Sequence, residues 1–273
     1  MYNDNWTELY HHGVKGQHWG ERRWQNEDGS LTPAGYAHYG YKGKNIRISK
    51  GSKLYRRSLA PSMDIKRFNV RNMYVSPTKQ DNETWKKFFK PVYGNSQFQI
   101  NFKARKDLNV ASQEDLAKAT ERGLHAYGKK IDRIYGSNKE VKKEVGETIK
   151  SLKSRASEET KRIQNSYYDR YKTKIEVNKD AVLGAMIISR MGNTSVLTNE
   201  ITHQLVKQGK DAVMDIWGLD VAKSPVIIMN PGKNAKPTLG TLLFAGTGNT
   251  NIERYSWKEN KATTKVRKNL KEI

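Results

Sequence analysis

Apolar and polar residues alternate in short stretches from Asn45 onward, and Gly, Pro, Asn or Asp separates one stretch from the next. The stretches are rich in β-forming residues, which predicts short strands. Two later, mostly apolar runs, DAVMDIW at 211–217 and SPVIIMN at 224–230, predict buried strands. The four earlier strand stretches are NIRIS (45–49), KLYRRS (53–58), NMYVS (72–76) and QFQINFKA (97–104).

Helical periodicity begins at Ser112, where Ser-Gln-Glu-Asp has the form of a capping box and predicts a helix through Leu116 and Leu124. After Gly136, apolar residues recur at steps of three, four or seven up to Ile175, which predicts a second, longer helix. The apolar run AVLGAMIISRM (181–191) predicts a buried helix, and residues 199–207 predict a short one that ends before Gly209. The expected fold class is α+β, a twisted mixed sheet with a helical insertion at about 112–178.

Residues 1–43 lack strand or helix periodicity, apart from a turn at Asp28-Gly29 and a helix start at Thr32-Pro33. They are rich in glycine, aromatic and charged residues, so we expect an extended N-terminal docking arm with one short helix. The last residues are basic and weakly patterned. The predicted organisation is an arm at 1–43, an α+β domain at 44–245 and a basic tail at 246–273.

The net charge of +22 favours an anionic partner or ligand. Residues 41–110 carry 17 basic and four acidic side chains, a net charge of +13, so an anion is expected there. Aromatic residues lie between these cations, and such rings stack on bases while Lys and Arg hold phosphates. One interpretation is that residues 41–110 bind DNA or RNA. The other is that the aromatic residues form the core of a sheet and the basic residues are only its solvated faces.

The absence of cysteine excludes disulfides, thiolate zinc sites and cysteine nucleophiles. It fits the cytoplasm or a particle assembled there. The first residues lack the basic start and apolar core of a signal peptide, and the longest apolar run, AVLGAMII, is too short to cross a bilayer. We therefore expect neither secretion nor a membrane partner.

Two groups of residues suggest site chemistry. His11, His12 and His18 could supply three imidazoles to zinc, but no partner on a regular element fixes their geometry, so no metal site is assigned. Arg56, Ser76 and Asp215 lie on or near three predicted strands. An arginine, a serine and a carboxylate could bind a dinucleotide phosphate, brace its ribose and stabilise a developing cation. Structural roles for all three remain equally open.

The stretch HHGVKGQHWGERR followed by QNEDGSLTPAG resembles a segment of the form HGxKGQxWGxRR and QNxDGSLTxxG. That segment recurs in virion-associated proteins of tailed bacteriophages and prophages. The resemblance implies a phage protein whose arm docks on virion or head proteins. The matching docking residues are His12, Gly13, Lys15, Gly16, Trp19, Gly20, Arg22 and Arg23.

The remainder is similar to the ADP-ribosyltransferase-like domains of such phage proteins. The similar pieces are ISKGSKLYRRS, NMYVSPTKQDNETW, QFQINFKARKDLNVAS and QGKDAVMDIWGLDVAKSPVIIMNP. The resemblance implies that Arg56 and Ser76 cradle NAD. In that family a later glutamate orients the ribose, whereas this chain has no glutamate between Ile201 and Ile252. Asp215 is then the candidate catalytic carboxylate, with Asp220 as the other aspartate available.

The sequence therefore favours a virion-associated, structural or head-packaged protein with an ADP-ribosyltransferase-like domain, located in the virion and the host cytoplasm. An active NAD-dependent ADP-ribosyltransferase that acts on a host protein is the first alternative. A nucleic-acid-binding accessory protein is the second.

Overall fold

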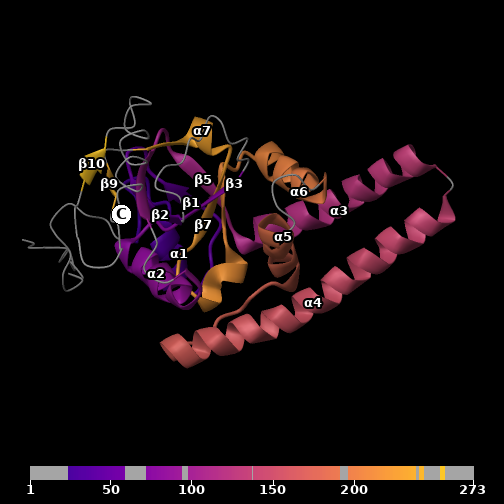
Figure 1. Cartoon of the computed structure of the whole chain (residues 1–273), viewed down its shortest axis with the longest axis horizontal. Helices are drawn as coiled ribbons and strands as arrows, with labels where there is room; N and C mark the ends of the chain where they lie inside the picture. Colours follow the sequence, from indigo (N-terminus) through magenta and orange to yellow (C-terminus); the bar gives the residue numbers. More distant parts are fainter. Residues whose placement is uncertain are drawn as a thin grey trace, which may run out of the picture.

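The computed structural model describes residues 24–58, 72–93, 98–136, 138–190, 196–237, 240–242 and 253–255. Helices and strands follow one another in an α+β order, with most of the helical residues in the middle of the chain (Figure 1). The elements are α1 (Pro33–His38), β1 (Ile46–Ile48), β2 (Lys53–Ser58), β3 (Asn72–Val75), α2 (Lys79–Tyr93), β4 (Phe98–Ala104), β5 (Leu108–Ala111), α3 (Gln113–Tyr135), α4 (Lys139–Tyr171), α5 (Lys179–Arg190), α6 (Val196–Lys207), β6 (Ala212–Met214), the 3-10 helix η1 (Ile216–Asp220), β7 (Val226–Met229), α7 (Pro231–Asn234), β8 (Ala235–Pro237), β9 (Gly240–Leu242) and β10 (Glu253–Tyr255).

Two sheets carry the candidate site. The larger has the order β1-β5-β6-β7-β3, in which β5 and β6 run parallel and the other pairs are antiparallel. The smaller sheet has the order β2-β4-β8 and is antiparallel. A bridge between Tyr55 of β2 and Ser76, the residue after β3, joins the two sheets. The expected mixed-sheet α+β class is confirmed.

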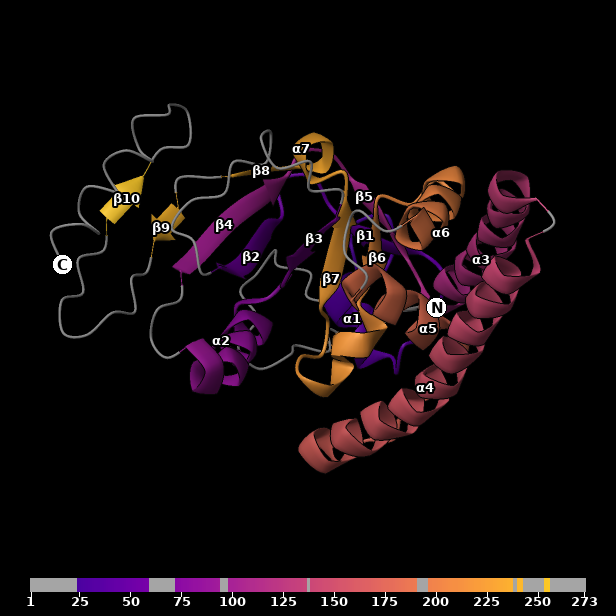
Figure 2. The ribbon, with the colours of Figure 1, turned by 45° about the vertical axis from the view of Figure 1, so that its right-hand side comes forward.

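A layer of helices accompanies the larger sheet. Helix α5 contacts α3, α4, α6 and η1, and residues 181–188 of α5 are all buried, as the apolar run predicted. Helices α3 and α4 form a long hairpin that projects away from the sheets (Figures 1 and 2). The capping box predicted at Ser112 is present, since its side chain accepts from the Asp115 N–H and Asp115 accepts from the Ser112 N–H.

Residues 24–43 differ from the extended arm expected there. The short helix starts as predicted, with Thr32 as the N-cap of α1. Tyr36 and Tyr41, however, are 0% and 1% exposed and belong to the same core as the sheets. The Tyr41 hydroxyl donates to the Lys223 carbonyl oxygen at 2.7 Å. Burial of these two large rings is favourable and would be lost if the segment extended into solvent. It therefore stabilises residues 24–43 against the domain.

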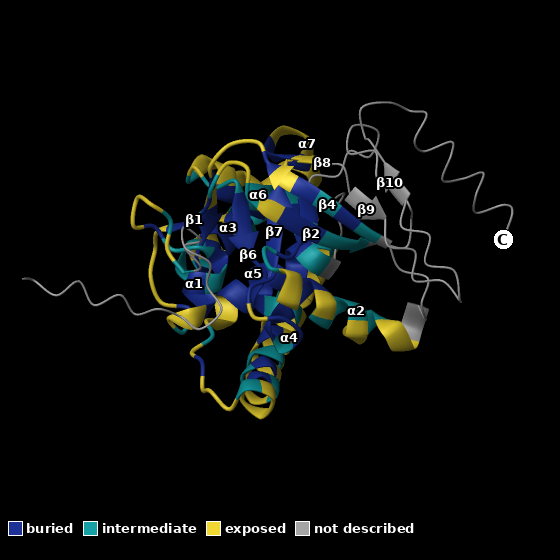
Figure 3. Cartoon of the chain, turned by 90° about the vertical axis from the view of Figure 1, so that its left-hand side faces the viewer, coloured by how far each residue is buried: buried dark blue, intermediate teal, exposed yellow. Residues whose placement is uncertain are grey.

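Two further elements differ from the expected pattern. The strand predicted at 211–217 ends at Met214, and the chain turns at Asp215 into η1. Residues 79–93 form α2, for which the sequence pattern gave no helix. Figure 3 shows the buried residues gathered in the sheets and α5, with exposed residues along α2 and α4. Within the described ranges, no helix is both long and apolar enough to span a bilayer.

Candidate functional site

The candidate site lies where the two sheets meet, beside the Tyr55–Ser76 bridge. The Tyr55 N–H donates to the Ser76 carbonyl at 2.9 Å, and the Ser76 N–H donates back at 2.7 Å. Successive residues of a strand point to opposite faces, so Arg56 points away from the face that Tyr55 occupies. Arg56 pairs across the sheet with Ile100, which is buried. The arginine therefore lies on the apolar face of the smaller sheet.

The Arg56 guanidinium reaches the larger sheet but makes few hydrogen bonds. Its Nη1 donates to the Tyr74 carbonyl oxygen at 3.1 Å, while its buried Nε has no hydrogen-bond partner among the described residues. Burial lowers the pKa of Arg56, and the nearby Tyr74 only partly opposes this effect. Within the described chain, no carboxylate forms an ion pair with Arg56. A buried cation without a counter-charge is costly, so the arrangement favours an anion beside Arg56.

Tyr74 connects Arg56 to Asp215. Tyr74 pairs with Ile227, which pairs with Val213 on its other side, and cross-strand partners share a sheet face. Asp215 follows Val213 by two residues and continues the ladder through its N–H to the Pro225 carbonyl at 2.8 Å, so it lies on the Tyr74 face. The pKa of Tyr74 is raised by burial and by the charge of Asp215.

Asp215 is a buried carboxyl at the N-terminal end of η1, only 2% exposed. Burial raises its pKa to about 7, the N–H groups of Gly218 and Trp217 oppose this rise, and the charge of Asp220 adds to it. A Cβ on Gly218 would lie 2.7 Å from the Asp215 Oδ2, so glycine leaves room for the carboxyl. The Asp215 Oδ1 has no hydrogen-bond partner among the described residues.

Ser189, near the end of α5, completes the group. Its hydroxyl lies close enough to lower the pKa of Tyr74, yet the two hydroxyls do not meet hydrogen-bonding geometry, and both are buried and unpaired within the described chain. We call Arg56, Tyr74, Ser189 and Asp215 the inter-sheet cluster. Each of the four contributes a buried polar atom without a partner among the described residues, and Tyr74 is the residue that the other three approach, which fits a polar ligand or ordered water beside Tyr74.

The three residues singled out in the sequence are only partly brought together. Arg56 and Ser76 occupy neighbouring positions of the joined strands, and Ser76 is 3% exposed. Asp215 approaches Arg56 through Tyr74, and no hydrogen bond or ion pair among the described residues joins the two directly.

Sequence reasoning missed Tyr74 and Ser189. Tyr74 has the same strand parity as Ser76, and Ser189 is a polar residue in an otherwise apolar run. Those two signals could have identified them.

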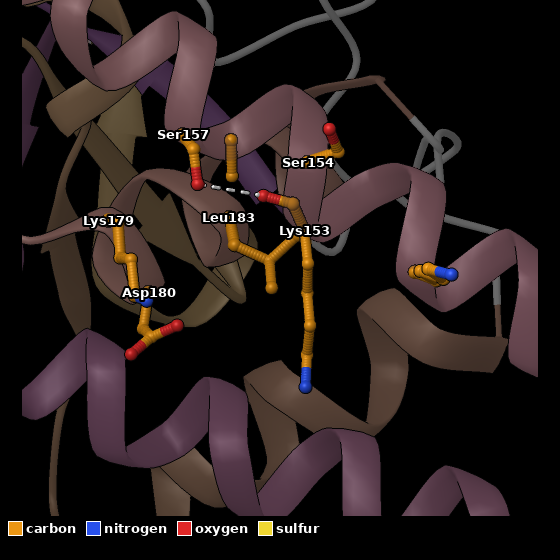
Figure 4. Close-up of a pocket in the computed structure, with 8 residues that line it drawn as sticks. Lys153, Ser154, Ser157, Lys179, Asp180 and Leu183 are labelled. Carbon is orange, nitrogen blue, oxygen red and sulfur yellow. Dashed lines mark hydrogen bonds between the residues drawn. The ribbon is translucent and has the colours of Figure 1, made fainter.

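A surface depression lies between α4 and the start of α5 (Figure 4). Lys153 of α4 and Lys179 and Asp180 of α5 line it together with Ser154 and Ser157. These polar side chains are exposed, and the Ser157 hydroxyl donates to the Lys153 carbonyl of its own helix at 3.2 Å. Water satisfies such groups without a ligand, so the depression indicates no specific chemistry.

The proposed arm residues, His12, Gly13, Lys15, Gly16, Trp19, Gly20, Arg22 and Arg23, lie outside the described residues, as do His11 and His18. In the described part of the chain, no group of three or more His, Asp or Glu side chains is arranged to hold a metal ion.

Comparison with known proteins adds no relative: no family model, curated protein or solved structure matches the chain.

Proposed function

We propose that this chain is a tailed-phage virion-associated protein whose α+β domain is ADP-ribosyltransferase-like and binds NAD at the inter-sheet cluster without efficient transfer. The observation that carries the proposal is the buried Arg56 guanidinium, whose Nε has no partner among the described residues. A guanidinium offers a fixed fork of donors that matches the oxygens of a pyrophosphate. The junction of β2 and β3 at Tyr55 and Ser76 supports the same assignment, because it sets Arg56 beside a second strand.

The chemistry at Asp215 argues against efficient transfer. Stabilising an oxocarbenium-like ribose requires an ionised carboxylate beside it. Burial raises the pKa of Asp215 to about 7, so part of this carboxyl is neutral at physiological pH. Asp also reaches about one bond less far than the glutamate that the resemblance implies. NAD binding with slow or absent hydrolysis is therefore the outcome that the residues favour.

Isothermal titration with NAD tests the binding step. Replacing Arg56 with Ala removes charged hydrogen bonds worth about 1.5–3 kcal/mol, so Kd should rise on the order of tenfold or more. Arg56→Lys keeps the charge but loses the fork and should weaken binding as well. Arg57→Lys is the matched control: Arg57 lies on the opposite face of β2 and pairs with Glu83, so its change should leave Kd unaltered. Equal losses in Arg56→Lys and Arg57→Lys would refute the assignment.

Incubation with NAD labelled in its ADP-ribose part tests the transfer step. We expect label on neither the chain nor added host protein beyond a slow background. Transfer well above that background, abolished by Asp215→Asn, would replace the proposed function with the enzymatic alternative.

The virion assignment rests on the N-terminal resemblance. Residues 1–23 should be required for incorporation into particles, while the domain at 44–245 should not suffice. Mass spectrometry of purified particles that carry the full chain or a variant without 1–23 measures this. Undiminished incorporation of the shortened chain would overturn it.

A further inference from the structure

Three aromatic side chains of α2 form a cluster on one side of that helix. Trp85, Phe88 and Phe89 follow the spacing i, i+3 and i+4, which places them on one face. The Trp85 and Phe89 rings stack with centroids 5.5 Å apart, and Phe88 meets them edge-on at 5.7 and 5.4 Å. Phe88 is 51% exposed. A large ring so exposed on a folded surface often marks an interaction site.

The first turns of α2 are anchored to the domain by buried polar contacts. Asp81 is 5% exposed and accepts hydrogen bonds from the N–H groups of Lys223 and Ser224, both at 3.1 Å. Asn82 is 2% exposed and donates to Gln99 of β4 at 2.7 Å. These buried contacts hold the first turns against the domain. The later turns, which carry the aromatic cluster, extend along an exposed edge (Figures 2 and 3).

The charge around the cluster is positive. Lys87 and Lys90 are exposed within two residues of Phe88 along the chain, and α2 has no acidic residue after Glu83. Lys86 is also partly exposed, with Glu83 as a partner at 3.8 Å. The charge complements phosphates, and the rings complement the flat faces of unpaired bases. A duplex hides those faces by stacking, and the carboxylates of an acidic peptide would pair with the lysines but would not stack on the rings.

We propose that the later turns of α2 bind single-stranded nucleic acid, with Phe88 stacking on a base and Lys87 and Lys90 holding flanking phosphates. The recognition uses ring faces and phosphates and not the 2′-hydroxyl, so DNA and RNA strands bind alike. This surface is separate from the inter-sheet cluster, and the proposal is independent of NAD binding.

Fluorescence anisotropy with labelled oligothymidylate and oligouridylate about 20 nucleotides long tests the proposal in the full chain. Both strands should bind with similar Kd, and a duplex of the same length more weakly. Phe88→Ala should raise Kd on the order of tenfold. Ile134→Ala, at a 60% exposed apolar side chain on the α3–α4 hairpin, is the matched control and should change nothing.

The contribution of the two lysines is tested with a second pair of variants. Lys87→Glu with Lys90→Glu should flatten the slope of log Kd against log salt by about 1.4 or more, since each phosphate contact on a single strand contributes about 0.7. Lys139→Glu with Lys143→Glu changes the net charge equally on exposed positions of α4 and should leave the slope nearly intact. Equal effects of the two pairs would show that net charge alone drives binding. A lower melting temperature in Phe88→Ala with unchanged Kd would show that the ring packs against protein. Either result overturns the proposal.

Discussion

Arg56 of the smaller sheet donates its Nη1 to the carbonyl oxygen of Tyr74 in the larger sheet, 3.1 Å away. The contact spans the junction of the two sheets, beside the Tyr55–Ser76 bridge. It places a buried cation beside Tyr74, whose pKa also responds to Asp215. One arginine thus helps to join the sheets and, through an Nε that has no partner in the described part of the chain, offers a donor to an anion.

Asp215 should make stability fall as pH rises. Its pKa is raised from 3.8 to about 7, so the folded state holds this proton more tightly than the unfolded chain does. The resulting stabilisation is present below pH 4 and is lost between about pH 4 and 7. Each unit of pKa difference corresponds to about 1.4 kcal/mol, so the change amounts to a few kcal/mol.

Urea unfolding of wild type and Asp215→Asn at pH 5 and pH 8 measures this dependence. The asparagine variant cannot ionise, so it should gain stability relative to wild type as pH rises. A constant difference between the two proteins at both pH values would contradict the assignment of a buried, neutral carboxyl.

Two glycines in helices should respond with opposite signs to alanine. A Cβ on Gly184 of α5 would lie 2.1 Å from the Thr120 Oγ1 and 2.9 Å from the Leu116 Cδ1, so Gly184→Ala should cost about 1–3 kcal/mol. Gly146 of α4 has open space around it, and Gly146→Ala should stabilise by about 0.5–1 kcal/mol through helix propensity. Thermal melts decide the matter. A stabilised Gly184→Ala would mean that α3 and α5 are less closely packed than described.

Truncation at two positions should separate the N-terminal segment from the core. Removing residues 1–40 deletes Tyr36, which is fully buried, and should lower the free energy of unfolding by about 3 kcal/mol or more. Removing only 1–23 should leave that free energy within about 0.5 kcal/mol, because Trp24, which stacks on His38 at 4.2 Å, is kept. Guanidinium denaturation of both variants provides the comparison. Similar losses in the two would place 1–23 in the core.

Asp81 should be among the most sensitive carboxylates for stability. Its side chain accepts from the N–H groups of Lys223 and Ser224 and from the Ser224 hydroxyl. Asp81→Ala leaves those donors without a partner and should cost about 3 kcal/mol. Asp132→Ala breaks an exposed pair with Lys142 and should cost less than about 1 kcal/mol. Equal melting temperatures for the two variants would refute the structural role of Asp81.

The sequence predicted correctly those helices that are determined by residues close together in the chain. The Ser112 capping box and the apolar run in α5 identify their helices because the determining residues are neighbours in the chain. Helix α2 was missed because its Trp and Phe residues favour strands as much as helices, and its buried contacts run to distant residues such as Ser224. Alternation suggested a strand through Trp217, but the turn at Asp215 ends it.

The candidate site depended still more on distant residues. Arg56 was identified by its strand, but its neighbour Tyr74 lies 18 positions away, and Ser189, which lies near Tyr74, is more than a hundred positions from Arg56. The raised pKa of Asp215 depends on its burial, and the alternation of apolar and polar residues does not determine how deeply a residue is buried. The sequence therefore predicted two residues of the inter-sheet cluster, Arg56 and Asp215, and neither the other two nor their arrangement.

NAD binding at Arg56 is tested most directly by the nuclear magnetic resonance signal of the Arg56 Nε–H, assigned by its loss in Arg56→Lys and followed as NAD is added. We expect this signal to shift downfield and to saturate with the Kd measured by titration, because the Nε, which has no partner among the described residues, then donates to a phosphate oxygen. The Nε–H of Arg57, on the opposite face of β2, should stay in place. An Arg56 signal that does not move at saturating NAD would show that no phosphate of NAD reaches this guanidinium.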